Sequence, residues 1–186
     1  MEFNLQPTLR GTHVELRPLA LEDFEALYAA ASDPLVWEQH PEPLRYRREV
    51  FQKFFDSAIE SRGAFTAVDI ASGKIIGSSR YYGYDPAKRE VKIGYTFVGR
   101  TYWGGIYNPE MKRLMLDHAF RFVDRVQFEI GECNLRSQKA IERVGAKLVG
   151  KLDLPGLDGT MHPMRVFEIT IRPKGERAAD HLKGGG

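Results

Sequence analysis

The sequence contains little cysteine and no long apolar run. Its single cysteine, Cys133, excludes an intramolecular disulfide bond and is typical of a protein from a reducing compartment. No stretch approaches the roughly 20 apolar residues that a membrane-spanning helix requires. The first residues, Met1-Glu2-Phe3-Asn4, lack the positive charge and the apolar segment of a signal peptide. We therefore expect a cytoplasmic protein with no membrane partner.

An excess of charge of one sign is also missing. The 27 Lys and Arg residues nearly balance the 25 Asp and Glu residues, which gives a formal net charge of +2. Proteins that bind nucleic acid usually carry a stronger and clustered basic excess, so nucleic acid is not expected as a partner. The five histidines do not follow the spacing of metal ligands, and no metal is expected.

The length and the hydrophobic content are sufficient for one globular domain. The chain has 186 residues, of which 42% are hydrophobic. We expect a single domain over residues 1–173. Residues 174–186 are polar and are expected to form a disordered tail.

Apolar periodicity predicts both strands and helices. Strands are expected at His13–Arg17, Ala64–Ile70, Ile75–Tyr82, Glu90–Val98, Val126–Glu132, Lys147–Leu152 and Met164–Ile171. Helices are expected at Leu21–Ala31, Val50–Gly63, Pro109–Asp124 and Leu135–Val144. This order indicates an α/β (α+β) fold that begins with antiparallel strands and has a crossover helix between parallel strands.

The strand Glu90–Val98 shows the clearest alternation. Val91, Ile93, Tyr95 and Phe97 are expected on one face of it, and the residues between them on the other. This alternation is typical of a strand.

The stretch 101-TYWGGIYNPEMK-112 combines a flexible turn with a helix start. Asn108 is a suitable N-cap, and Pro109 suits the first helical position. Gly104 and Gly105 would let backbone N–H groups approach an anion closely. A basic pair that begins at Lys112 is unfavourable near a helix N-terminus unless an anion binds there. The stretch is either a phosphate-binding turn or a tight turn before a capped helix with a solvated basic pair.

A second stretch, 134-NLRSQKAIERVGAKLVG-150, also follows a strand and begins a helix. Asn134 can cap this helix, and Ser137 shares a face with apolar residues further along it. Arg136 and Arg143 lie on an adjacent face. The alternative interpretation is that Ser137 stands at a helix start because hydroxyl groups favour that position, and that the basic residues are solvated.

These stretches, in this order, resemble the GCN5-related N-acetyltransferase (GNAT) superfamily, in the branch of the ribosomal-protein alanine N-acetyltransferases. The resemblance covers roughly residues 10–172 and follows the family's order of elements. The matching pieces are Leu16-Arg17-Pro18-Leu19 with Asp23, Ile76-Gly77-Ser78, Ile93-Gly94-Tyr95-Thr96, Tyr102-Trp103-Gly104, Glu110, Lys112, Asn134, Arg136-Ser137, Ala140-Ile141-Glu142, Gly145-Ala146 and Gly150.

The resemblance implies a fold and a cosubstrate. The fold is a mixed central sheet of about seven strands with four helices, split between the fourth and fifth strands. Acetyl-CoA or CoA would lie in this split, between the strand that ends near Val98 and the strand that ends near Glu132. The residues expected to bind it are Phe97, Val98, Trp103, Gly104, Gly105, Tyr107, Asn108, Lys112, Asn134, Arg136, Ser137 and Arg143.

The reaction that the resemblance implies is acetyl transfer from a thioester to a primary amine. The acceptor would be a small-molecule amine or a protein N-terminus, and a homodimer stays open. Ser137 is the candidate hydrogen-bond donor to the departing thiolate, and Glu90 is the candidate base, although a solvated strand residue is the commoner role. The acceptor site is expected to be lined by Trp37, Glu38, Tyr81 and Tyr82, each of which could equally be packing.

Three positions depart from the family pattern. Ile106 stands where relatives usually have glycine, Lys92 where they often have glutamate, and Ile141 where some have tyrosine. Two alternatives to the acetyltransferase therefore stay open. One is a weakened CoA-binding or interaction module, and the other is a transferase for a longer acyl group.

Overall fold

The computed structural model describes residues 2–156 and 158–171 of the chain, so the expected tail at 174–186 lies outside the described residues. Eight strands form one mixed sheet in the order β1-β2-β3-β4-β5-β6-β8-β7. The strands are β1 (Leu9–Arg10), β2 (Val14–Pro18), β3 (Ala64–Asp69), β4 (Ile75–Asp85), β5 (Glu90–Val98), β6 (Arg125–Gly131), β7 (Lys147–Pro155) and β8 (Met161–Thr170). The predicted mixed sheet is confirmed, and the short strand β1 adds to the expected seven.

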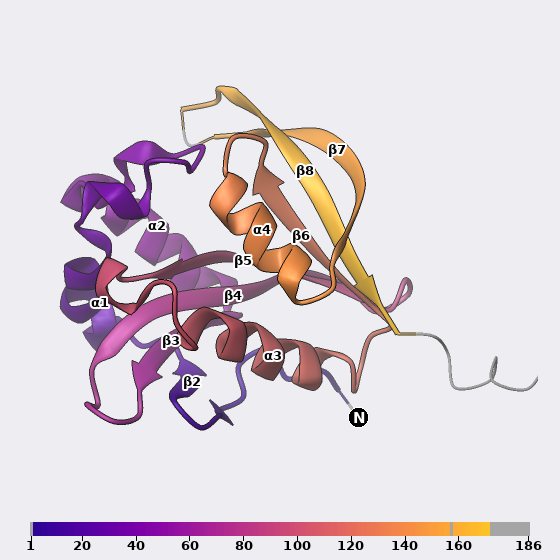
Figure 1. Ribbon diagram of the computed structural model, residues 1–186, viewed down its shortest axis with the longest axis horizontal. Coiled ribbons are helices and arrows are strands. Elements are labelled where there is room, and N and C mark those ends of the chain that lie inside the picture. The colour runs from indigo at the N-terminus through magenta and orange to yellow at the C-terminus, as the bar shows by residue number, and fades with distance from the viewer. Residues whose placement is uncertain (1, 157, 172–186) are drawn as a thin grey trace, which may run out of the picture.

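Four α-helices accompany the sheet, as predicted. They are α1 (Phe24–Ala31), α2 (Arg48–Ser61), α3 (Tyr107–Ala119) and α4 (Leu135–Arg143). In Figure 1, α3 and α4 lie on the side of the sheet that faces the viewer, and α2 lies behind it. Among residues 2–156 and 158–171, no helix is long and apolar enough to cross a membrane.

Helix α3 differs from its prediction at both ends. It begins at Tyr107, before Pro109, and the residue that precedes it is Ile106 in a helical conformation. It ends at Ala119, where the N–H groups of Arg121 and Phe122 form shorter-range turn bonds to the carbonyls of His118 and Ala119, at 3.2 and 2.9 Å. The expected N-cap role of Asn108 is therefore wrong.

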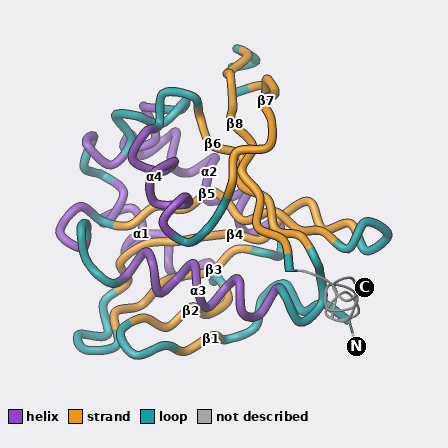
Figure 2. Tube along the Cα trace, turned by 45° about the vertical axis from the view of Figure 1, so that its right-hand side comes forward, coloured by secondary structure: helices purple, strands orange, loops and turns teal. Residues whose placement is uncertain are grey.

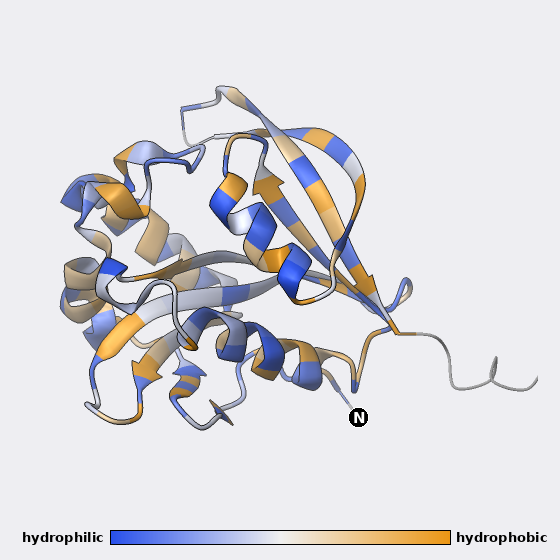
Figure 3. Ribbon diagram, viewed as in Figure 1, coloured by the Kyte–Doolittle hydropathy of each residue, from blue (hydrophilic) through white to orange (hydrophobic). Residues whose placement is uncertain are grey.

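Apolar side chains pack on both faces of the sheet. Met111, Met115 and Ala119 of α3 are fully buried against one face. Phe51 and Phe54 of α2 belong to a separate aromatic cluster on the other face. Orange and blue alternate along β8 in Figure 3, as expected for a strand with one face in the core.

The sheet splits between β5 and β6. These strands pair in parallel only over Glu90–Lys92 and Arg125–Gln127, and all other neighbouring strands are antiparallel. Beyond this short ladder the two halves of the sheet diverge, and α4 lies across the opening (Figures 1 and 2). The split was predicted at this position.

A bulge in β5 breaks the alternation that the sequence predicts. Against β4, Ser78 pairs with Phe97 but Arg80 pairs with Gly94, so two residues of β5 oppose one residue of β4. Tyr95, inside the bulge, has a left-handed backbone with φ of 53°. Because an extra residue reverses the side-chain faces, Phe97 packs with the aromatic cluster of α2 and Tyr95 is 40% exposed.

Glu110 attaches the first turn of α3 to the β1–β2 turn. Its carboxylate accepts hydrogen bonds from the backbone N–H groups of Thr12, His13 and Val14, at 2.7, 2.8 and 3.0 Å. Burial opposes ionisation of this group, but the three donors outweigh it and hold the pKa of Glu110 below its ordinary value. The carboxylate therefore fixes the position at which α3 begins.

Replacing Glu110 by glutamine is expected to lower the free energy of unfolding by about 2–3 kcal/mol, because an amide cannot satisfy three donors. Glu60→Gln, at an exposed position of α2, is the control. The contribution of Glu110 is fully present above the ordinary carboxyl pKa and is lost as pH falls through the lowered folded-state pKa. Urea denaturation should therefore show a difference at pH 7 that shrinks in acid, and equal stabilities at pH 7 would contradict this role.

Candidate active site

A large cleft occupies the split between β5 and β6. It has a volume of about 670 Å³ and extends from the turn before α3 to α4. Past Lys92 and Gln127 the facing edges of β5 and β6 no longer pair with each other. Their backbone N–H and C=O groups are therefore available to an extended ligand that lies between the strands.

Lys112 of α3 forms part of the cleft wall at the level of the bulge. The residue is only 4% exposed, and its Nζ donates a hydrogen bond to Thr96 Oγ1 at 2.5 Å. Thr96 Oγ1 also lies 2.8 Å from the hydroxyl of Ser79, which is fully buried. Burial lowers the pKa of the Lys112 ammonium to about 7. An amine that exchanges a proton near neutrality therefore borders the cleft.

The turn before α3 uses its glycines differently from the family pattern. Gly104 has a positive φ of 69°, whereas Ile106 has φ of −83° and needs no glycine-like conformation. Space around Gly104 and Gly105 is open, with nothing within 4 Å of an added Cβ at either position. Asn108 lines the cleft, and its Oδ1 is buried without a hydrogen-bond partner among the described residues. A buried polar atom of this kind is expected to contact a ligand or water.

The start of α4 forms the opposite wall. Asn134 caps the helix as predicted, because its side chain accepts a hydrogen bond from the backbone N–H of Ser137 at 3.1 Å. Arg136 reaches across the cleft: its guanidinium lies 4.0 Å from the centre of the Trp103 ring and 3.3 Å from Glu38. Ser137 and Arg143 line the same wall. Arg136 in the first turn of α4 and Arg143 in its last turn thus bring positive charge to the entrance of the cleft.

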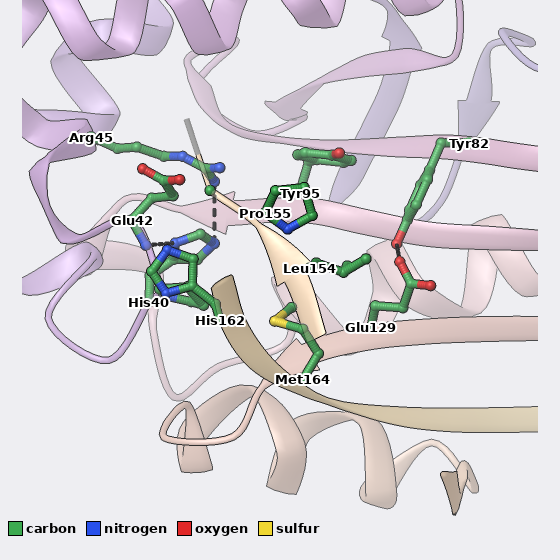
Figure 4. A pocket seen from close by; sticks show the side chains of 12 residues that line it. His40, Glu42, Arg45, Tyr82, Tyr95, Glu129, Leu154, Pro155, His162 and Met164 are labelled. Carbon is green, nitrogen blue, oxygen red and sulfur yellow. Dashed lines mark hydrogen bonds between the residues drawn. The ribbon is translucent and has the colours of Figure 1, made fainter. Parts of the chain in front are cut away.

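A second, smaller cavity of about 140 Å³ adjoins the cleft. It lies between the segment that follows η2 (Pro34–Val36) and the tip of the β7–β8 hairpin (Figure 4). The two cavities share four lining residues: His40, Tyr95, Glu129 and Met164. A molecule in the small cavity would therefore meet a molecule in the cleft at these residues.

Glu129 is the acidic residue at this junction. Its carboxylate accepts hydrogen bonds from Lys92 Nζ at 2.5 Å and from the Tyr82 hydroxyl at 3.0 Å, and its side chain is 7% exposed. Burial raises the pKa of Tyr82, and the Glu129 charge adds to this effect. Lys92 stands where relatives often have glutamate, so in this chain a carboxylate reaches the same region from the neighbouring strand.

Most residues that the sequence predicts for the cosubstrate line the large cleft. They are Phe97, Val98, Trp103, Gly104, Gly105, Asn108, Lys112, Asn134, Arg136, Ser137 and Arg143, and Trp37 lines it as well. Tyr107 does not line it, because its hydroxyl donates to Asp69 at 3.0 Å. Tyr82 lines the small cavity.

Three other predicted residues lie elsewhere. Tyr81 is fully buried beneath α3, and its hydroxyl bonds to the carbonyl of Met115, so it cannot line an acceptor site. Glu90 lies where β5 and β6 still pair and contacts Arg125, at the closed end of the split. Glu38 is bound to Arg136 and lines neither cavity.

The residues that sequence reasoning missed are Thr96, Glu129, His40 and Arg45, together with the buried state of Lys112. Lys92 gave a signal for Glu129, since a lysine in place of a glutamate suggests a carboxylate nearby. Nothing in the local pattern indicated His40 or Arg45. Among residues 2–156 and 158–171, no group of three or more His, Cys, Asp or Glu side chains is arranged to hold a metal ion.

Several solved structures of acetyltransferases have the same fold as this chain. A GCN5-related N-acetyltransferase from Brucella melitensis has a TM-score of 0.78 at 24% identity, covering 89% of this chain and 79% of that chain. RimJ from Mycobacterium smegmatis, in complex with CoA-disulfide, has a TM-score of 0.66 at 21% identity and covers 88% and 86%. The microcin C7 self-immunity acetyltransferase MccE, in complex with acetyl-CoA and AMP, has a TM-score of 0.72 at 16% identity and covers 91% and 100%.

The TM-scores of these structures establish the fold of the chain. The family is shown by the match of the sequence to a family model. No curated protein matches the chain. A family model described as acetyltransferase (GNAT) domain matches residues 13–147, most of the chain. The match includes the split, the turn before α3 and the start of α4. The chain therefore belongs to the GNAT acetyltransferase family, as its motifs predict.

Proposed function

We propose that this protein is an acetyl-CoA-dependent N-acetyltransferase that acts on a primary amine. The observation that carries the proposal is the open split between β5 and β6, where unpaired strand edges and two helix starts border a cleft of about 670 Å³. A cleft of this size accommodates a ligand of the size of a nucleotide with a long tail. The adjoining small cavity supplies a separate place for an acceptor.

The residues present fit acetyl-CoA. Arg136 and Arg143 supply positive charge for the phosphates, and the open turn at Gly104 and Gly105 lets backbone N–H groups face them. The unpartnered Oδ1 of Asn108 accepts a hydrogen bond from a ligand donor. The unpaired edge of β5 forms hydrogen bonds with the amide groups of acetyl-CoA, which lies extended beside the strand.

When bound, acetyl-CoA supplies an acetyl thioester whose sulfur departs as a thiolate. Ser137 donates a hydrogen bond toward that sulfur from the start of α4. Lys112 Nζ holds a proton with a pKa of about 7, whereas a free thiol has a pKa near 8.5. Transfer of this proton to a thiolate is therefore favourable. We assign Lys112 as the acid that completes the reaction.

The acceptor amine must lose a proton before it attacks, because alkyl amines have a pKa near 10 and are protonated at neutral pH. Glu129 lies at the junction of the two cavities, so its carboxylate attracts the ammonium and accepts this first proton. The second proton, which the nitrogen loses after attack, replaces the one that Lys112 gives to the thiolate. Lys92 and Tyr82 hold this carboxylate in place. Glu90 is too near the closed end of the split to serve as this base.

Reversing the two charges at the entrance tests the cosubstrate site. We expect Arg136→Glu together with Arg143→Glu to weaken acetyl-CoA binding about 100-fold, since two charge-assisted contacts become repulsive. Calorimetric titration with acetyl-CoA and with CoA measures this directly. Lys151→Glu, on β7 and outside both cavities, is the control.

The wild-type protein should bind acetyl-CoA in the micromolar range and release free thiol when an acceptable amine is added. Binding without thiol release for any amine would favour the interaction-module alternative. Unchanged affinity in the doubly substituted protein would refute the proposed phosphate contacts.

A further inference from the structure

The small cavity contains a buried arginine whose positive charge is poorly satisfied. Arg45, in the 3-10 turn Pro43–Tyr46, is only 6% exposed and lines the cavity. Its guanidinium lies over the rings of Phe54 and Trp37, at 4.8 and 5.5 Å from their centres, and its Nε has no hydrogen-bond partner. None of the ion pairs in the described part of the chain includes Arg45.

Arg45 stays positively charged despite its burial. Burial lowers the pKa of its guanidinium to about 10, and the nearby charge of Glu42 only partly opposes this. At neutral pH a full charge therefore lies in a site that is largely removed from water. Buried charges are usually paired or fully hydrogen-bonded, because the cost of removing them from water is high.

His40 helps to define the kind of hydrogen-bond acceptor that this part of the cavity lacks. Its Nδ1 accepts a hydrogen bond from the backbone N–H of Glu42 at 2.9 Å, and its Nε2 lies 3.2 Å from Arg45 Nη1. Burial, with the charge of Arg45 next, lowers the pKa of His40 well below its ordinary value, so the ring is neutral. A neutral imidazole has one acceptor nitrogen, and the backbone N–H already uses it.

The proton of His40 must therefore lie on Nε2. The contact between Nε2 and Arg45 Nη1 then joins two donors and is not a hydrogen bond. Both residues line the same cavity. An oxygen atom that accepts from both His40 Nε2 and Arg45 Nη1 would satisfy these two donors.

The two ends of the cavity differ in charge. Figure 4 shows His40, Glu42, Arg45 and His162 at one end, and Tyr82 and Glu129 at the other. Glu42 also faces the Arg45 end, where its oxygen packs beside Gly156. Because Glu42 would repel a bound anion, occupancy of this end depends on Arg45.

We infer that the Arg45 end of the small cavity binds an oxyanion of the acceptor, and that the acceptor is a small amine that also carries a carboxylate or phosphate group. This inference rests on the proposed acetyl transfer and specifies its substrate class. The oxyanion contacts Arg45 and His40, and the amine points toward Glu129 and the cleft. A cavity of about 140 Å³ suits a molecule with a short spacer between the two groups.

Acceptors of equal length test this substrate class. β-Alanine and 2-aminoethylphosphonate carry an oxyanion, whereas β-alaninamide and propylamine do not. For the wild-type protein we expect kcat/KM for at least one oxyanion acceptor to exceed that for the two acceptors without an oxyanion by about 30-fold or more. The comparison between carboxylate and phosphonate identifies which oxyanion is preferred. Thiol release and product mass give the rates.

A pair of arginine variants tests the assigned residue. Arg45→Met should bring kcat/KM for the acceptors with an oxyanion close to kcat/KM for the acceptors without one, so that their ratio is near one. Arg80→Met is the matched control, because Arg80 is also buried, at 5% exposed, and lies over Tyr95, but does not line the cavity. It should keep the ratio. Thermal melting and acetyl-CoA titration of both variants verify that they are folded.

The comparison of kcat/KM between acceptors uses only the wild-type protein, so misfolding of a variant cannot leave the inference undecided. Acetylation of all four amines at similar kcat/KM would overturn the inference and leave the proposed function standing. An unchanged ratio in Arg45→Met would overturn the role of Arg45. If no amine is acetylated, β-alanine is titrated into the CoA-saturated protein. Binding that Arg45→Met abolishes would support the oxyanion site, although the proposed acetyl transfer would fail. Absence of binding would overturn both the oxyanion site and the proposed transfer.

Discussion

Replacing Lys112 with methionine should make the protein more stable and at least 100-fold less active. The wild-type ammonium is 4% exposed, and its one hydrogen bond goes to the uncharged hydroxyl of Thr96. Lowering a lysine pKa from 10.5 to about 7 corresponds to roughly 3–5 kcal/mol of lost stability at neutral pH. Methionine fills a similar volume without charge, so the variant recovers most of this energy.

The stability difference between Lys112→Met and wild type should depend on pH with a definite sign. Between pH 7 and 10.5 the unfolded chain binds the lysine proton and the folded chain does not, so wild-type stability rises with pH. The advantage of the variant is therefore largest at pH 7 and below. It should shrink by about 1.4 kcal/mol for each pH unit above 7.

Urea denaturation at pH 6, 7, 8 and 9 measures this difference, and thiol release measures the activity. Lys53→Met, at an exposed position of α2, is the control and should change neither stability nor rate appreciably. The loss of kcat reflects the absence of the proton donor, and general acid catalysis contributes about 10²–10⁴-fold. A variant that is less stable at every pH, or that keeps its activity, would refute the assignment.

The family and the split could be predicted because they depend on local features. The alternation around Val91 and Ile93, the helix cap at Asn134 and the spacing of the motifs are properties of short segments, which the sequence displays directly. The same segments line the large cleft. Local pattern was therefore sufficient to predict most of the residues that line the large cleft, where we propose that the cosubstrate binds.

The bulge in β5, the burial of Lys112 and the pairing of Lys92 with Glu129 could not be predicted, because they depend on contacts between distant segments. The bulge at Tyr95 arises from the register between β4 and β5, and it moves Phe97 to the other face. Lys112 is buried only because α3 packs against β5 at Thr96. The pairing of Lys92 with Glu129 joins residues 37 positions apart.

The position of Tyr81 illustrates the same limit. Its neighbour Tyr82 reaches the small cavity, while Tyr81 points to the opposite face and is fully buried. Adjacent residues of a strand always face opposite ways, so at most one of the pair could line the site. The sequence shows the pair, but only the packing of α3 shows which residue is covered.

Glu129→Gln should lower kcat/KM about 100-fold or more for ordinary alkyl amines while leaving acetyl-CoA affinity unchanged. The glutamine can still accept a hydrogen bond from Tyr82, but it cannot hold a proton. Lys92 loses its ion pair and is 28% exposed, so water can solvate it in part. Lys92→Met, which keeps the carboxylate, is the matched control and should cost much less activity.

Comparing amines of different pKa distinguishes a role of Glu129 as the base from a purely structural role. Amines whose own pKa lies below the assay pH are already neutral and need no deprotonation before they attack, so Glu129→Gln should lose much less activity with them than with strongly basic amines. If the variant loses the same factor for strongly and weakly basic amines, Glu129 only positions its neighbours. Selective loss for the strongly basic amines would mean that this chain takes from β6 the carboxylate that its relatives often carry on β5. Lys92 would then be the ion-pair partner of the base, and its presence in place of glutamate would not indicate a loss of acetyltransferase activity.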